Sequence, residues 1–455
     1  MVAYPELAAI RLGYGLSPLA DPPADVAAVL SSVGAAAPDG DALRTQDFIE
    51  IISARNEINR RTRDGDQGAR QELVDLRRKA NDMYFRTMQL RFARAVDEPV
   101  GFGERLVQFW SDHFTTRIGE SFRRLLTVAH VDEAIRPHLN GHFTDMLFAA
   151  ETHPAMLTYL DQNSSVGPNS RAARNQPKRN LGLNENLARE MIELHTLGVG
   201  GDYSQDDVRE LAELLTGLRF NPGQDRIFRP ELAEPGAETV LGESYGGDGK
   251  ADLADIRAVM EDLARHPSTA QHMARKLAAH FVDDDPPQPL VERLAETWTS
   301  SNGHLSELYA VLAESSELES HFRKKVRQPF DFIVASMRAL GLTGDDVRAF
   351  EMKQVRNWLQ YPLTRMGQRW GLPTGPDGWP EAAESWASPQ GLAARIDWVM
   401  RIAPRMVPDL PKPAVFLQAA LGSTASEPLQ WAVPKAETAR EALVIVLASA
   451  DFNRR

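Results

Sequence analysis

Apolar residues recur at spacings of three and four along most of this chain, and this period constrains the fold more than any other feature. Leu106, Phe109, Trp110, His113 and Phe114 show it clearly. Such steps bring side chains to one face of an α-helix. Strand-like patterns are confined to short stretches between residues 218 and 250. The sequence therefore predicts a mainly α, multi-helix globular bundle with at most a small β element around residues 218–245.

Three regions of the chain differ in composition. Residues 1–98 hold a helical lead-in and a long charged helix, which Asp64-Gly65 could interrupt. Residues 99–250 hold a helical core and the small β element. Residues 251–455 give further helical patterns, at 253–265, 269–281, 289–298, 306–315 and 329–340, and a Trp- and Pro-rich loop at 371–389. At 455 residues, about three times a common domain, the chain is expected to form two or three packed subdomains.

Several classes of protein and site are excluded by composition. The chain has no cysteine, which excludes disulfides, thiolate zinc sites and iron–sulfur clusters. No haem or nucleotide-binding motif occurs. The net charge of -12 opposes nonspecific nucleic-acid binding. There is no uninterrupted apolar run of about 18 residues, the minimum for a membrane span, and no signal-peptide pattern. We expect a cytoplasmic protein.

The helix expected from Asn184 to Leu197 carries the clearest candidate chemistry. On an α-helix, Asn186, Glu190 and Glu193 share one face, and Arg189 lies at its margin. One interpretation is an acid/base or metal-binding carboxylate site, and the other is a structural polar network. Both predict that the two glutamates are largely buried, near Arg189 or another base, and beside His113 or His153. Glu190→Ala is then expected to cost about 3 to 5 kcal/mol.

Three histidines, His113, His153 and His195, lie in or beside helical segments and could converge with Glu190 or Glu193. Zinc, iron or manganese accepts such ligands, so a divalent metal is one open alternative. Neutral core histidines or helix caps are the other. His195 in the last helical turn is also explained by the helix dipole, which favours a cation there.

A polar loop precedes this helix. Its basic residues, Arg171, Arg174, Lys178 and Arg179, could hold a phosphate or sulfate group near the helix start, or could simply be solvated. Asp161, Asn163 and Asn186 are the other candidates for substrate contacts. Further along the chain, Trp370, Trp379 and Trp386 could stack against a sugar or aromatic ligand, or could anchor their loop to the core.

Four segments together resemble the hallmarks of the domain of unknown function 1800 family. They are Phe109-Trp110-Ser111-Asp112-His113-Phe114, residues 153–161 (HPAMLTYLD), residues 184–190 (NENLARE) and residues 193–199 (ELHTLGV). The resemblance implies a bacterial, largely helical protein of unestablished activity, from a family with many exported members. It also implies a partner of the domain of unknown function 1501 family, similar to phosphatases and sulfatases.

Two functions follow as hypotheses. The first is an acid/base or metal-dependent enzyme with a polar centre. Its proposed catalytic residues are Glu190, Glu193, His195, His113, His153 and Arg189, and its proposed substrate contacts are Arg171, Arg174, Lys178, Asn186, Asp161 and Asn163. The alternative is a noncatalytic scaffold or maturation partner of the phosphatase-like protein.

Overall fold

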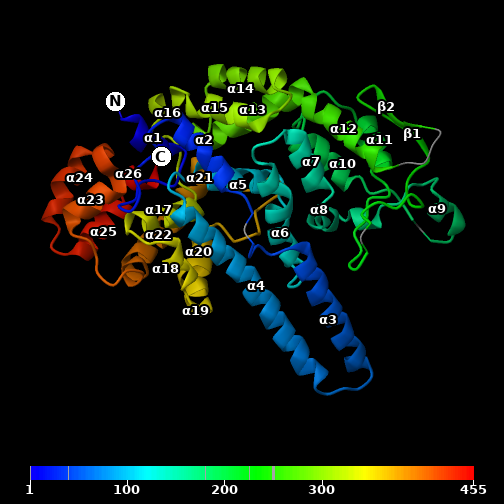
Figure 1. Cartoon of the computed structure of the whole chain (residues 1–455), viewed down its shortest axis with the longest axis horizontal. Coiled ribbons are helices and arrows are strands. Elements are labelled where there is room, and N and C mark those ends of the chain that lie inside the picture. The colour runs from blue at the N-terminus through cyan, green and yellow to red at the C-terminus, as the bar shows by residue number, and fades with distance from the viewer. Residues whose placement is uncertain (1, 39, 180, 225, 248–251) are drawn as a thin grey trace.

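The computed structural model describes residues 2–38, 40–179, 181–224, 226–247 and 252–455, and these are mainly α-helical, as predicted. The N-terminal helices include a pair that projects from the body of the molecule (Figure 1). They are α1 (Tyr4–Arg11), α2 (Val26–Ala35), α3 (Thr45–Arg63), α4 (Ala69–Asp97), α5 (Phe102–His113) and α6 (Arg124–His130).

The projecting pair is α3 and α4, which pack against each other. The long charged helix expected here is interrupted at the Asp64-Gly65 position. α3 ends at Arg63, and Gly65 adopts a φ of 91°, a left-handed conformation that glycine tolerates. The carboxylate of Asp66 then accepts a hydrogen bond from the Gly68 amide at 2.9 Å. The chain therefore reverses and returns along α4 to the core.

The central region follows with short helices, including two π-helical turns, η1 and η4. Its elements are η1 (Val131–Ile135), η2 (Arg136–His138), α7 (Phe143–Glu151), α8 (Pro154–Tyr159), η3 (Gln162–Ser164), α9 (Arg171–Asn175), α10 (Asn186–Glu190), η4 (Met191–His195), α11 (Gln205–Leu214), β1 (Gly236–Val240) and β2 (Glu243–Gly247). The expected helix at 184–197 is thus α10 continued by a π-helical turn, and it packs against α11.

The β element is one antiparallel hairpin, β1 with β2, in which Gly236 pairs with Gly247 and Val240 with Glu243. An isolated bridge joins Leu218 and Phe228. The expected small element is confirmed, and it extends two residues past the predicted end at 245.

The C-terminal region is again helical. Its elements are α12 (Leu253–Arg265), α13 (Pro267–Phe281), α14 (Gln288–Ser300), α15 (Leu305–Ala313), α16 (Glu317–Ser320), α17 (Pro329–Ala339), α18 (Gly344–Arg348), α19 (Met352–Gln354), η5 (Val355–Gln360), α20 (Tyr361–Arg365), α21 (Ala383–Trp386), α22 (Pro389–Arg401), η6 (Ala403–Arg405), α23 (Pro413–Leu421), η7 (Gly422–Thr424), α24 (Glu427–Ala432), η8 (Val433–Lys435), α25 (Ala439–Leu447) and α26 (Ala450–Asn453). The helical patterns expected from 253 to 340 all fall on helices.

Buried apolar residues from Leu7 to Phe452 form one cluster that runs through all three regions. Its large polar-tipped side chains are paired: the Trp110 indole donates to the Tyr309 hydroxyl at 2.7 Å, and the Trp298 indole donates to the Ala264 carbonyl at 2.9 Å. Burying an unpaired indole N–H would cost free energy, so these bonds let the rings contribute their full apolar area. Among the described helices, none is both long and apolar enough to cross a membrane. The division into three subdomains stays a prediction.

Candidate functional site

The ends of α5 and η4 meet in the core and bring His113 and His195 together. Each side chain is 2% exposed, and their ring centres lie 5.7 Å apart. His113 Nε2 lies 3.2 Å from the backbone carbonyl oxygen of His195. The sequence hypothesis placed both residues in one polar centre, and the fold brings these two together.

A buried carboxylate that the sequence did not single out completes this pair. Glu151, at the end of α7, is fully buried, and its Oε1 lies 2.5 Å from His195 Nδ1. The other oxygen, Oε2, has no hydrogen-bond partner among the described residues. A carboxylate on one imidazole nitrogen fixes the orientation and tautomer of the ring.

The far side of His113 contacts a lysine. Lys276 Nζ, on α13, donates to His113 Nδ1 at 3.0 Å, so the proton of the neutral ring is assigned to Nε2, which faces the His195 carbonyl. Burial and the nearby Lys276 hold the pKa of His113 well below its usual range. Burial also lowers the pKa of Lys276, and the nearby Asp112 raises it in part. These groups form a polar chain from Glu151 to Lys276.

Asp112 precedes His113 and lies under the loop at 371–380. The Trp379 amide donates to both Asp112 carboxylate oxygens at 2.9 Å. Gly378 makes this approach possible, because a Cβ there would lie 2.7 Å from the Asp112 carboxyl carbon. Burial raises the pKa of Asp112 well above its usual value, and Glu381 and Asp377 add to the effect. Asp112 is therefore held in its protonated form more firmly than an exposed aspartate.

Glu190 lies near this centre and is half-buried. Burial raises its pKa, which His195 opposes and Glu193 reinforces. The sequence predicted that Glu190 is largely buried in an ion pair. This prediction is wrong, because Glu190 is only half-buried and makes no ion pair with any described base.

Glu193 instead faces Arg189. Arg189 Nη1 lies 3.1 Å from Glu193, and its Nη2 lies 3.2 Å from Glu185, so the predicted contact between Arg189 and Glu193 is confirmed. The Glu193 side chain is 23% exposed and that of Arg189 39% exposed, which places both on the helix surface. The α-helical period used from the sequence does not hold through η4, because a π-helical turn contains more residues than an α-helical one.

His153 lies apart from the other two histidines and caps α8. Its Nδ1 accepts from the Ala155 amide at 3.1 Å, and its Nε2 lies 2.9 Å from Glu133. No contact joins it to Glu190 or Glu193 among the described residues. The helix-capping alternative therefore describes His153.

The proposed substrate contacts do not gather at the centre. Arg171, Arg174, Lys178, Asn186 and Asp161 are exposed. The Asn163 side chain accepts from the Phe220 amide at 2.7 Å, which holds two loops together. The Arg179 side chain is exposed as well. None of these residues lines the pocket described next.

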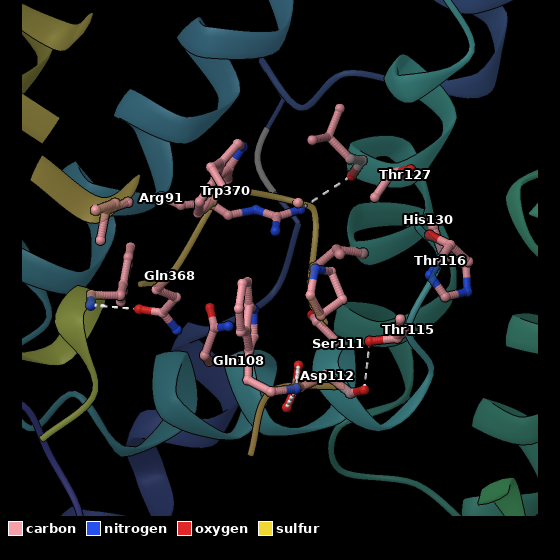
Figure 2. Close-up of a pocket in the computed structure, with 17 residues that line it drawn as sticks. Arg91, Gln108, Ser111, Asp112, Thr115, Thr116, Thr127, His130, Gln368 and Trp370 are labelled. Atoms are coloured by element: carbon pink, nitrogen blue, oxygen red, sulfur yellow. Dashed lines mark hydrogen bonds between the residues drawn. The ribbon is translucent and has the colours of Figure 1, made fainter. Parts of the chain in front are cut away.

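Asp112 also lines a pocket with about 660 Å³ of empty space, part of it open to solvent. Figure 2 shows Arg91 and Trp370 on one side of it and Thr116, Thr127 and His130 on the other, with Asp112 at the base. Its walls come from α4, α5, α6, α17 and the loop after α20. Its remaining lining residues are Gln108, Ser111, Thr115, Val128, Val131, Phe330, Leu363, Gln368, Gly371, Pro373 and Trp379.

His130 is the second titratable group in this pocket that the sequence did not indicate. Its Nε2 has no hydrogen-bond partner among the described residues. In the tautomer that carries its proton on Nδ1, Nε2 is a free acceptor. Burial holds the pKa of His130 well below its usual value, with His153 adding to the effect. Its only sequence signal was a position inside a helical pattern.

The sequence left two alternatives for Trp370, Trp379 and Trp386, which were stacking against a ligand and anchoring their loop to the core. Trp370 and Trp379 line the pocket, whereas Trp386 is 2% exposed and packs against Trp379 and Val326. Trp386 therefore anchors the loop, and Trp370 and Trp379 are available to a ligand.

The candidate metal ligands are not gathered in the part of the chain that the structure describes. There, the only three acidic or histidine side chains with ligand atoms within 4.8 Å of one another are Glu210, Glu213 and Glu238. Burial and a hydrogen bond with Glu210 raise the pKa of Glu238 to about 8, which favours a shared proton. A metal at the histidine centre would require His113, His195 and Glu190 to move.

The chain matches the model of a known protein family. A family model described as protein of unknown function (DUF1800) matches residues 8–454. No curated protein and no solved structure matches the chain.

Proposed function

The chain belongs to the DUF1800 family of proteins of unknown function, and from that premise we propose that it is an enzyme that acts on a small polar molecule by acid–base chemistry. The observation that carries the proposal is that Asp112 and His130 line the same pocket with oppositely perturbed proton affinities. Burial disfavours the charged form of both groups, so the pocket holds a neutral carboxylic acid that can donate a proton beside a neutral imidazole that can accept one.

Asp112 is the proposed acid. Its raised pKa favours the protonated form, which can donate a proton to a bound ligand, while Trp379 fixes the carboxyl group from the other side. His130 is the proposed base. Its lowered pKa keeps the imidazole neutral, and its unpartnered Nε2 can accept a proton from the ligand.

The chain of Glu151, His195, His113 and Lys276 is proposed to tune Asp112 rather than to touch the ligand. None of these four lines the pocket. Lys276 is the member whose charge opposes the raised pKa of Asp112. Glu190, Glu193, Arg189 and His153 are not proposed as groups that touch the ligand.

Metabolite profiling tests this proposal without a known substrate. The purified protein is incubated with a bacterial small-molecule extract, and mass spectrometry follows which compounds are consumed. We expect at least one compound to be consumed by the natural protein and to persist with Asp112→Asn and with His130→Gln. An identical profile for the natural protein and both variants would remove the proposal.

The metal-dependent form of the enzyme is tested by the metal content of protein purified without a histidine tag. Bound metal at one ion per chain that is lost in His195→Ala would replace the acid–base proposal with a metal-dependent one. The scattered donors favour the acid–base form.

A noncatalytic role as a partner protein is the second candidate, and the projecting hairpin of α3 and α4 favours it (Figure 1). This arm exposes charged residues of both signs, the bases Arg60, Arg63, Arg70, Arg77, Arg78 and Lys79 and the acids Glu50, Glu57, Asp64, Asp66, Glu72 and Asp75. Such a projecting charged surface suits a partner protein of complementary charge pattern. Co-purification with the domain of unknown function 1501 protein, lost when the arm's bases are changed to glutamine, would support it. The cytoplasmic location stays a prediction of the sequence.

A further inference from the structure

Five buried polar atoms without partners belong to residues that line one pocket. Arg91 Nε, Thr116 Oγ1, Thr127 Oγ1, His130 Nε2 and Trp370 Nε1 are buried, have no hydrogen-bond partner among the described residues, and belong to residues that line it. Buried polar atoms are ordinarily paired, and an unpaired one costs about 1–3 kcal/mol. By contrast with Trp370, the buried indoles of Trp110 and Trp298 are paired.

The pocket also carries a positive charge without a counterion. Arg91 makes no ion pair with any described carboxylate, and its Nη2 donates only to the Val128 carbonyl, at 3.2 Å. The acids on the neighbouring helices are already engaged, because Arg136 binds both Glu104 and Asp132. Arginine stays protonated in proteins, so the Arg91 guanidinium suits an anionic group of a ligand.

The other walls suit a hydroxylated ring. The Thr116 and Thr127 hydroxyls can each donate and accept a hydrogen bond, and the Trp370 indole N–H can donate one. The Arg91 guanidinium lies 5.4 Å from the centre of the Trp370 ring, which places the cation beside a flat apolar face. A ligand that uses all of these groups has one anionic group, several hydroxyls and a compact apolar face.

We propose that this pocket binds a sugar acid, with its carboxylate on Arg91 and its hydroxyls on Thr116 and Thr127. This inference concerns the same pocket as the proposed function and names its substrate class. Binding tests this proposal and turnover tests the proposed function, because Asp112→Asn should bind the ligand without converting it.

Isothermal titration calorimetry on the full chain tests the proposal with three probes at constant ionic strength. D-glucuronate has the carboxylate and the hydroxyls, D-glucose has only the hydroxyls, and sulfate has only the charge. We expect saturable binding of one glucuronate per chain, at least about tenfold tighter than either of the others. Absence of glucuronate binding, or equal binding of all three probes, would overturn the proposal.

Two variants assign the binding to the pocket. Arg91→Gln should weaken glucuronate binding at least about tenfold, whereas Arg78→Gln, on the same helix with a side chain 68% exposed, should leave it unchanged. Thr127→Val keeps the shape and removes an unpaired buried hydroxyl, so it should raise the melting temperature while weakening binding several-fold. Unchanged glucuronate affinity in both Arg91→Gln and Thr127→Val would overturn the assignment, and the stable Thr127→Val decides if Arg91→Gln does not fold.

Discussion

The same three helices, α4, α5 and α6 with its continuation into η1 and η2, build two charged clusters of opposite character. In the first, Glu104 receives Arg136 at 2.6 and 2.8 Å and Arg94 at 3.0 Å, and Arg136 also binds Asp132 at 2.9 Å. In the second, Arg91 and His130 face the pocket and keep unpartnered atoms. We call the first cluster saturated, because its charged groups are paired with one another, and such a cluster stabilises the fold. The second is open, because its unpartnered atoms can still bind a ligand.

The largest expected effect comes from breaking the saturated cluster. Glu104→Ala removes two of the three charge-assisted bonds of the buried Arg136, which keeps only Asp132 as a carboxylate, and should lower the free energy of unfolding by about 3–5 kcal/mol. Urea denaturation measures this. Glu57→Ala, which breaks an exposed ion pair with Arg60 on α3, is the control and should cost less than about 0.5 kcal/mol. Equal costs would show that the saturated cluster is not stabilising.

The pH dependence of Glu104 gives the sign of its contribution. Burial alone would raise its pKa, but Arg136 lowers the value below the usual 4.5. A carboxylate with a lowered folded pKa contributes stability above its unfolded pKa, and this is lost as the pH falls through the folded value. The stability difference between the natural protein and Glu104→Gln should therefore shrink below about pH 4.5. A constant difference from pH 7 to pH 3 would contradict the assigned pairing.

The second effect concerns Glu151, which binds His195 through Oε1 while its Oε2 has no partner among the described residues. Glu151→Ala leaves the buried His195 Nδ1 without a partner and should cost about 1–3 kcal/mol. Glu151→Gln retains an oxygen for His195 and should recover most of that loss. Thermal denaturation of the two variants measures the difference, and similar melting temperatures for both would show that His195 does not depend on Glu151.

The third effect has the opposite sign. A raised folded pKa means that folded Asp112 binds its proton more tightly than the unfolded chain, so stability is lost as the pH rises from the unfolded value of 3.8 toward the folded one. Asp112→Asn removes this loss and still accepts from Trp379. It should therefore be more stable than the natural protein at pH 7 and similar to it near pH 3.5. A variant that is less stable at pH 7 would make Asp112 a structural residue.

The smallest effect is expected at Glu190. The cost of 3 to 5 kcal/mol expected from the sequence assumed a buried ion pair, but Glu190 is half-buried and pairs with no described base. Glu190→Ala should therefore change the free energy of unfolding by about 1 kcal/mol or less. A loss as large as that of Glu104→Ala would place Glu190 in a saturated cluster after all.

The sequence anticipated the helices well where local signals mark their ends. The pattern at 253–265 coincides with α12, and a capping box of Ser204 and Asp207 marks the start of α11. Both depend on residues within a few positions of each other, where spacing and capping decide the structure. The candidate site was anticipated only in part: His113 and His195 meet, but His153 caps α8, Asn163 joins two loops and Arg171 is exposed.

By itself, the sequence predicted the helical class, a possible break at Asp64-Gly65, the small β element and the family. These follow from local periodicity, turn chemistry and motifs, which need no distant contact. Tertiary structure alone decided which polar groups are paired. Arg91 and Arg94 lie one turn apart on α4, yet Arg94 reaches Glu104 while Arg91 faces a pocket. Glu151, Lys276 and Asp112 come from three helices, and their chemistry arises from burial and from neighbours distant along the chain, which no spacing in the sequence records.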